Sequence, residues 1–133
     1  MILMRHQKAI EWENRLKSVF DEIDAELEND YGGMFSRHPA RAPDGGTSNP
    51  EMDGLFNVGA SFSAGFGSRF GPGYVVNIQL LTLEHVPAKL KATLRDHVQA
   101  LLIEKLPVAF PGKELHVDEE LRHLRIHGDL SLD

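Results

Sequence analysis

The apolar positions near the start of the chain follow a helical period. They recur at steps of three and four, as Trp12, Leu16, Val19, Phe20, Ile23 and Leu27. This spacing is typical of one face of an amphipathic helix. Gly32 and Gly33 come next, and glycine accepts the left-handed backbone that ends helices. The pattern predicts a helix over about residues 5–30.

A period of two begins after a long irregular segment. The apolar residues Phe56, Val58, Ala60, Phe62, Ala64 and Phe66 alternate with small or polar ones. Strict alternation is the signature of a strand, so we expect the phenylalanines to enter the core. "GSRFGPG" is typical of a turn, and Tyr74 to Leu80 continues the alternation in a partner strand. Matching the faces of this hairpin pairs Ser63 with Asn77 and Ser61 with Gln79.

The second half of the chain repeats the order of helix and hairpin. Pro87 suits the first turn of a helix, and Pro107 with "FPG" at 110–112 is predicted to end it. Its buried stripe is predicted to be Leu90, Leu94, Val98, Leu101, Leu102 and Leu106. The tail then predicts two strands whose inward residues are Leu115, Val117, Leu124, Ile126, Leu130 and Leu132. A turn near Glu119-Glu120 would pair His116 with His123 and Glu114 with Arg125.

These elements predict a single α+β domain over residues 1–133. The order α-β-β-α-β-β favours a two-layer sandwich, with two helices on one face of a four-stranded, largely antiparallel sheet. The strand order stays open, because a parallel or an antiparallel arrangement fits a helix between two hairpins. Residues 32–54 contain three prolines and form a long irregular loop, which is usually either functional or disordered.

Composition narrows the class of protein. The formal net charge of −6 disfavours nucleic acid as a partner. The chain has no cysteine, which excludes disulfides, thiolate catalysis and Cys-ligated metal. The apolar run before Arg5 is too short for a signal peptide or a membrane span. We therefore expect a cytoplasmic protein with no membrane partner, and no cofactor is predicted.

Two stretches of the sequence resemble catalytic or cofactor-binding motifs but do not match them. "GFGSRFG" lies between two predicted strands, whereas a dinucleotide-binding loop must open a helix. "GASFS" lacks the second glycine of a nucleophile elbow, and its serines lie within a strand. A base such as His38 could still reach Ser61 or Ser63, so whether the protein is an enzyme stays open.

Histidines suggest a weak metal site in the last hairpin. His116 and His123, if directly opposed, would have Cβ atoms about 5 Å apart. His123 and His127 would lie roughly 13 Å apart along one strand and could not share a metal. Two ligands make a weak site, and a solvated histidine-rich face is the alternative.

The loop sequence "SRHPARAPDGG" gathers Arg37, His38 and Arg41 in an otherwise acidic protein. Two permanent charges and one titratable group suit the recognition of a carboxylate or phosphate. The arginines could instead pin the loop to Glu26 or Glu28 of the first helix.

One face of the first predicted strand carries only small or polar side chains, at Asn57, Gly59, Ser61, Ser63 and Gly65. Glycine weakens a strand and often indicates a close neighbour, which could be the 34–54 loop, a second subunit or a flat ligand. The first hypothesis is a non-catalytic binding or assembly domain that forms a homodimer through its open sheet face. The second is a small enzyme or sensor for an anionic metabolite, using the residues Arg37, His38, Arg41, Asn57, Ser61, Ser63, Asn77 and Gln79.

Overall fold

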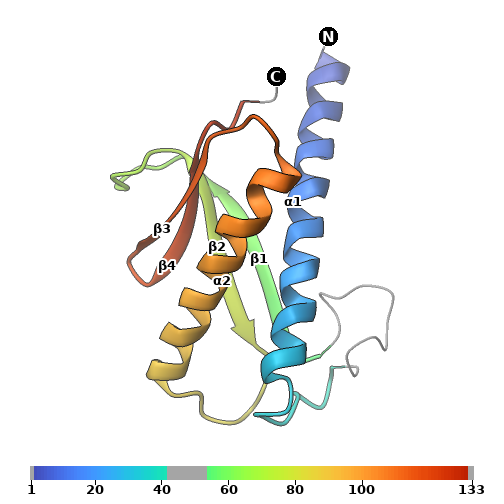
Figure 1. Ribbon diagram of the computed structural model, residues 1–133, viewed down its shortest axis with the longest axis vertical. Helices are drawn as coiled ribbons and strands as arrows, with labels where there is room; N and C mark the ends of the chain where they lie inside the picture. Colours follow the sequence, from blue (N-terminus) through green and yellow to red (C-terminus); the bar gives the residue numbers. More distant parts are fainter. Residues whose placement is uncertain (1, 42–53, 132–133) are drawn as a thin grey trace.

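The computed structural model describes residues 2–41 and 54–131, with side chains from residue 7 onward (Figure 1). Its elements are α1 (Ile2–Tyr31), β1 (Phe56–Ser63), β2 (Gly73–Leu80), α2 (Ala88–Ala109), β3 (Leu115–Glu120) and β4 (His123–Gly128). This order confirms the predicted α+β class.

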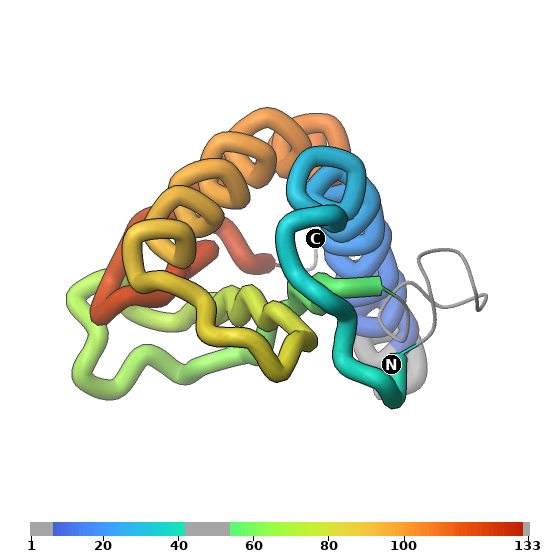
Figure 2. Tube along the Cα trace, turned by 90° about the horizontal axis from the view of Figure 1, so that it is seen from below, coloured from blue at the N-terminus to red at the C-terminus, as the bar shows by residue number. Residues whose placement is uncertain are grey.

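The strands form one antiparallel sheet in the order β1-β2-β4-β3. The two hairpins therefore meet through β2 and β4, which are antiparallel. Both helices lie on the same face of the sheet, α1 against β1 and α2 against β3 and β4, and no helix of the described residues lies on the other face (Figure 2). The two-layer sandwich of the prediction is confirmed, and the strand order that the sequence left open is settled.

Helix α1 buries the stripe that its sequence predicts. Each of the six stripe residues is at most 8% exposed. The helix ends at Tyr31, where the Gly32 N–H donates to the Glu28 carbonyl oxygen at 2.9 Å. A Cβ atom at Gly32 would clash with that same oxygen, so glycine is required at this end of the helix.

The core fills the space between the helices and the sheet. Ile23 of α1, Leu102 of α2 and Ile126 of β4 are completely buried in it. At one end, the Trp12 ring stacks on Tyr74 with centroids 5.2 Å apart and packs against Phe110 at 4.4 Å. This layer of apolar contacts fixes the helices to the sheet.

The predicted register of the first hairpin is wrong. Ser63 lies opposite Gly73 and Ser61 opposite Val75, four positions from the predicted partners Asn77 and Gln79. The faces are nevertheless correct, because a shift by an even number preserves the alternation. The error arises because β1 ends at Ser63, which leaves residues 64–72 as a longer connection than the predicted turn.

Because β1 ends at Ser63, two phenylalanines that were predicted to be buried are exposed. Phe56 is 1% exposed, as predicted, but Phe62 is 60% exposed and Phe66 is 97% exposed. Phe66 lies in the hairpin connection, and the Phe62 ring meets the Tyr74 ring of β2 in a T-shaped contact with centroids 5.6 Å apart. The prediction that all these rings enter the core was therefore wrong for Phe62 and Phe66.

The second hairpin turns two residues later than predicted. Its turn is Leu121-Arg122, not Glu119-Glu120, so His116 lies opposite His127 and Asp118 opposite Arg125. The predicted pairs of His116 with His123 and Glu114 with Arg125 were wrong. Leu132 lies outside the described residues, whereas Leu130 packs against the core.

Helix α2 buries its predicted stripe except for Leu90, which is partly buried, and it runs past Pro107 and ends directly before "FPG". The helix continues to Ala109, and the Phe110 N–H donates to the Leu106 carbonyl oxygen at 2.8 Å. Proline lacks one donor only, so the residues that follow it can still complete the last turn. In the described part of the chain, neither helix combines the length and the apolar character needed to cross a bilayer.

Candidate functional site

The sheet face without helices is the first candidate for a functional surface. Alternation directs the small side chains of β1 and their neighbours on β2 to this outer face. The face divides into two parts, one covered by the chain itself and one open.

The covered part lies under the connection between β1 and β2. The Arg125 side chain is 5% exposed and donates to the Gly71 carbonyl oxygen, at 3.0 Å from Nε and 2.6 Å from Nη2. Its Nη2 also donates to Ser63 Oγ at 3.2 Å. The Phe70 ring stacks on His127 with centroids 4.6 Å apart. Residues 64–72 therefore act as a clamp across β4, and Ser63 belongs to this internal network.

Glu120 of β3 also attaches the 64–72 connection to the sheet. The Arg69 N–H donates to Glu120 Oε2 at 3.2 Å. A hydrogen bond from the Ser68 side chain, with further contributions from the Arg69 N–H and the charges of Arg125 and Arg69, lowers the pKa of the Glu120 carboxyl. The carboxylate thus stays charged where it fastens the connection.

The open part is a strip of uncharged polar and small residues. We define the open strip as Asn57, Gly59, Ser61, Asn77 and Gln79. Asn57 lies opposite Gln79, and its Nδ2 donates to Gln79 Oε1 at 3.3 Å. Gly59 lies opposite Asn77, and a Cβ atom added to this glycine would meet no described heavy atom within 4 Å. Its φ is not positive, so neither backbone geometry nor packing against the described residues requires glycine here.

The open strip continues around the edge of the sheet into a groove of about 530 Å³ beside α1. Glu13, Lys17 and Tyr74 line this groove together with residues 57–62 of β1. Burial, with a further contribution from the charge of Glu13, raises the pKa of the Tyr74 phenol.

Two carboxylates of α1 cover the first half of the β1 edge. Glu28 Oε1 accepts the Phe56 N–H at 2.8 Å, and Asp24 Oδ1 accepts the Val58 N–H at 2.9 Å. Arg41 Nη2 donates to the Phe56 carbonyl oxygen at 3.4 Å on the same edge. Edge strands offer unpaired backbone groups to other chains, and the described residues that cover this edge reach only the first half of β1.

The loop residues of the predicted anion site face the protein's own backbone. Arg37 Nε donates to the Arg41 carbonyl oxygen at 2.9 Å, and Arg41 Nε donates to the Gly54 carbonyl oxygen at 3.1 Å. The His38 N–H donates to the Leu81 carbonyl oxygen at 2.6 Å, and His38 Nδ1 accepts the Ala40 N–H at 3.0 Å. These bonds attach residues 37–41 beside the start of β1.

The structure therefore brings together only part of the predicted anion site. Asn57 and Gln79 lie at the end of the hairpin where the loop attaches. Ser61 is four residues further along β1, which is about 13 Å at 3.3 Å per residue, and Ser63 is further still. The predicted residues therefore fall into three separate groups. Residues 37–41 form the loop group, Asn57, Ser61, Asn77 and Gln79 belong to the open strip, and Ser63 belongs to the clamp.

The predicted metal ligands are also separated. His116 lies opposite His127, with ring centroids 5.4 Å apart, and His123 lies opposite Glu120. The His127 ring nitrogen Nε2 is 2.7 Å from Asp118 Oδ2. Within residues 7–41 and 54–131, no group of three or more histidines and carboxylates is placed to hold a metal ion.

The comparisons with known proteins identify a family. A family model described as "Uncharacterised protein" matches residues 7–128. This chain belongs to that family. It is similar to an uncharacterized protein of Borreliella burgdorferi (strain ATCC 35210 / DSM 4680 / CIP 102532 / B31), with 36% identity over 114 residues, 86% of this chain and 89% of the relative. No solved structure matches the chain.

The span matched by the family model contains the open strip and also a basic cleft that the sequence did not predict. This cleft is lined by Lys91 and Arg95 of α2 and by Arg122 of the last hairpin. Lys91 and Arg95 are four residues apart, a spacing that places two side chains on one face of a helix and could have indicated the site. The contribution of Arg122 depended on the correct turn, which the sequence did not reveal.

Proposed function

We propose that the protein is a non-catalytic binding and assembly domain in which two copies join through the open strip. The proposal rests on the open space in front of Gly59, within strand β1. A glycine within a strand costs about 0.5–1 kcal/mol relative to alanine, and no described contact inside the chain requires it. A close neighbour outside the chain explains why the position is kept small.

The chemistry of the open strip favours a second copy as that neighbour. The amides of Asn57, Asn77 and Gln79 each carry both donors and acceptors. A two-fold interface places the same surface on both sides, so a strip of such groups can pair with itself. The strip also carries no charge, which limits repulsion between two chains of net charge −6.

The second hypothesis, an anionic metabolite bound by Arg37, His38 and Arg41 over the open strip, has less support. The hydrogen bonds of Arg37 and Arg41 to backbone carbonyl oxygens favour the alternative in which the arginines pin the loop. These carbonyl oxygens belong to Arg41, Gly54 and Phe56, beside the start of β1. We also propose a cytoplasmic location, for which the absence of cysteine is the support.

Sedimentation analysis over a range of concentrations tests self-association. The wild-type protein is expected to sediment as a dimer, and Gly59→Arg is expected to sediment as a monomer with an unchanged circular dichroism spectrum. The arginine enters open space in the monomer but would collide with its counterpart across the interface.

Gly33→Arg is the matched control. Gly33 also has open space around an added Cβ and no positive φ, but it lies after α1 and away from the open strip. This variant is expected to remain dimeric. A wild-type protein that is monomeric at every concentration, or a Gly59→Arg variant that dimerises as well as Gly33→Arg, would contradict the proposal.

A further inference from the structure

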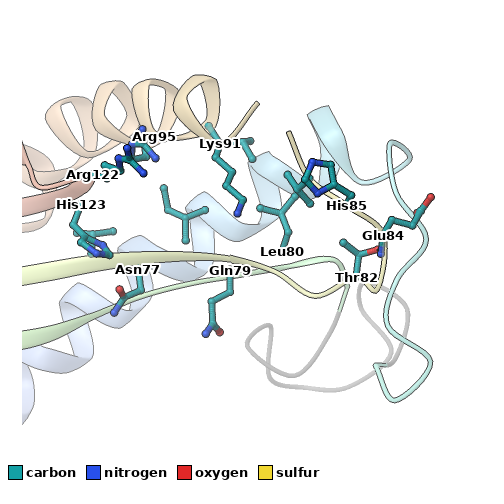
Figure 3. A pocket seen from close by; sticks show the side chains of 14 residues that line it. Asn77, Gln79, Leu80, Thr82, Glu84, His85, Lys91, Arg95, Arg122 and His123 are labelled. Atoms are coloured by element: carbon teal, nitrogen blue, oxygen red, sulfur yellow. The ribbon is translucent and has the colours of Figure 1, made fainter. Parts of the chain in front are cut away.

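A cleft opens where the pairing between β2 and β4 ends and β2 continues. The two strands pair from Gly73 to Val76 of β2, so the last residues of β2 have no strand on that side. The space beside them is a cleft of about 500 Å³ bounded by β2, the first turns of α2, residues 82–86 and the turn of the last hairpin (Figure 3). Ligand pockets for small molecules commonly have this size.

Basic side chains from three separate segments line this cleft. Lys91 and Arg95 come from α2, Arg122 and His123 from the last hairpin, and His85 from the 82–86 segment. In Figure 3, Lys91 extends from the helix toward β2, and Arg95 and Arg122 stand at the same end of the cleft. This is a local concentration of positive charge in a chain of net charge −6.

Acidic groups compensate only part of this charge. Arg95 Nε lies 3.0 Å from Glu119 Oε1, in an ion pair whose carboxylate side is half exposed. Glu84 also lines the cleft, but it accepts the Ser36 N–H and points away from the other labelled side chains (Figure 3). Across the described residues, no ion pair or side-chain hydrogen bond engages Lys91 or Arg122.

The backbone that carries Arg122 is unfavourable for its residue type. Leu121 and Arg122 have φ values of 53° and 67°, in a two-residue hairpin turn that normally takes asparagine and glycine. Left-handed backbone disfavours both side chains. Residues that violate a local preference often occur at functional sites, and here the side chain so placed faces the cleft.

The wall formed by β2 offers a donor and an apolar surface. Asn57 and Gln79 face each other as hydrogen-bonded partners, and the antiparallel ladder alternates, so Ile78 directs its N–H away from β1 and toward the cleft. The apolar residues that also line the cleft are Val76, Ile78, Leu80, Val86 and Leu94. A ligand with one charged end and an apolar or planar body matches this division.

We propose that the cleft binds a small phosphorylated metabolite. The phosphate lies between Lys91, Arg95 and Arg122, and the rest of the molecule contacts the apolar wall of β2 and α2. Guanidinium groups match phosphate oxygens with two parallel hydrogen bonds, and a lysine adds a point charge. The cleft shares Asn77 and Gln79 with the open strip, but its cations lie on α2 and the last hairpin, outside the strip.

Titration with inorganic pyrophosphate, followed by backbone amide NMR, tests the site. Saturable shifts are expected at the amides of Ile78, Lys91 and Arg122, and malonate at equal ionic strength is expected to bind more weakly. Arg122→Gly removes the charge and also places glycine where the turn favours it. We expect this variant to weaken pyrophosphate binding at least about tenfold, since a charge-assisted contact is lost, and to melt at a higher temperature.

Lys89→Ala is the control for charge alone. Lys89 is an exposed lysine of the same helix that does not line the cleft, so its loss is expected to leave pyrophosphate binding unchanged. Equal affinity for Arg122→Gly and wild type, equal weakening by Lys89→Ala, or shifts that sodium chloride reproduces would each overturn the proposal. Tighter binding of malonate than of pyrophosphate would overturn the assignment to phosphate.

Discussion

At the scale of single residues, carboxylates of α1 replace a neighbouring strand along the start of β1. Asp24 is 3% exposed, and its Oδ1 accepts the Val58 N–H at 2.9 Å. A buried backbone donor that loses its partner costs its desolvation energy. Asp24 therefore combines two roles, since it satisfies β1 and prevents other chains from pairing there.

Asp24→Ala is expected to lower the free energy of unfolding by about 1–3 kcal/mol, measured by urea denaturation. Asp24→Asn keeps an acceptor oxygen and is expected to lose less. The control is Asp21→Ala, which removes an exposed ion pair with Lys17 and is expected to change stability by no more than about 0.5 kcal/mol. Equal losses for the Asp24→Ala and Asp21→Ala variants would show that the edge contact does not stabilise the fold.

At the scale of elements, the sequence predicted which residues face the core better than where each strand turns. The stripes of α1 and α2 follow a helical period, and all their residues are buried as predicted except Leu90, which is partly buried. Both hairpin registers were shifted because the turns carry misleading residues. Leu121-Arg122 has no turn preference, and a strand pattern that runs to Phe66 concealed the end of β1 at Ser63.

Pro107 of α2 tests whether the cost of a proline inside a helix or the tertiary contacts of that helix decide the stability of its last turn. Pro107 is an exposed residue inside the helix and cannot donate to the preceding turn. Pro107→Ala is expected to raise the free energy of unfolding by about 1–3 kcal/mol, because the missing hydrogen bond becomes possible.

Pro111→Ala, just beyond the helix, is the comparison for this change. Proline at this position acts only by restricting the unfolded chain, so its replacement is expected to lower the free energy of unfolding by about 0.4–1 kcal/mol. Urea denaturation of both variants measures the difference. A destabilised Pro107→Ala variant would indicate that the tertiary contacts of the last turn depend on the proline.

At the scale of the whole molecule, the sheet presents two surfaces of different chemistry. The open strip is uncharged, and its small residues were evident from the alternation around Gly59. The spacing of Lys91 and Arg95 could have indicated part of the basic cleft. The whole cleft could not be predicted, because it depends on the pairing of β2 with β4 ending at Val76 and on the turn that places Arg122. Contacts between distant segments of this kind are not encoded in a local period.

These chemistries predict opposite responses to salt. Raising the ionic strength from about 10 to 150 mM shortens the screening length from about 30 to 8 Å. Two chains of net charge −6 then repel each other less, so the dimer is expected to tighten. Pyrophosphate binding depends on attraction to Lys91, Arg95 and Arg122, so it is expected to weaken over the same range.

Sedimentation and pyrophosphate titration at both ionic strengths measure the two responses on one preparation. A dimer that dissociates as salt is added would mean that ion pairs, and not the amides of the open strip, hold the interface. Pyrophosphate affinity that is independent of salt would mean that the cations of the cleft do not contact the phosphate. Opposite slopes would indicate that the cations of the cleft hold pyrophosphate and that uncharged groups hold the dimer interface.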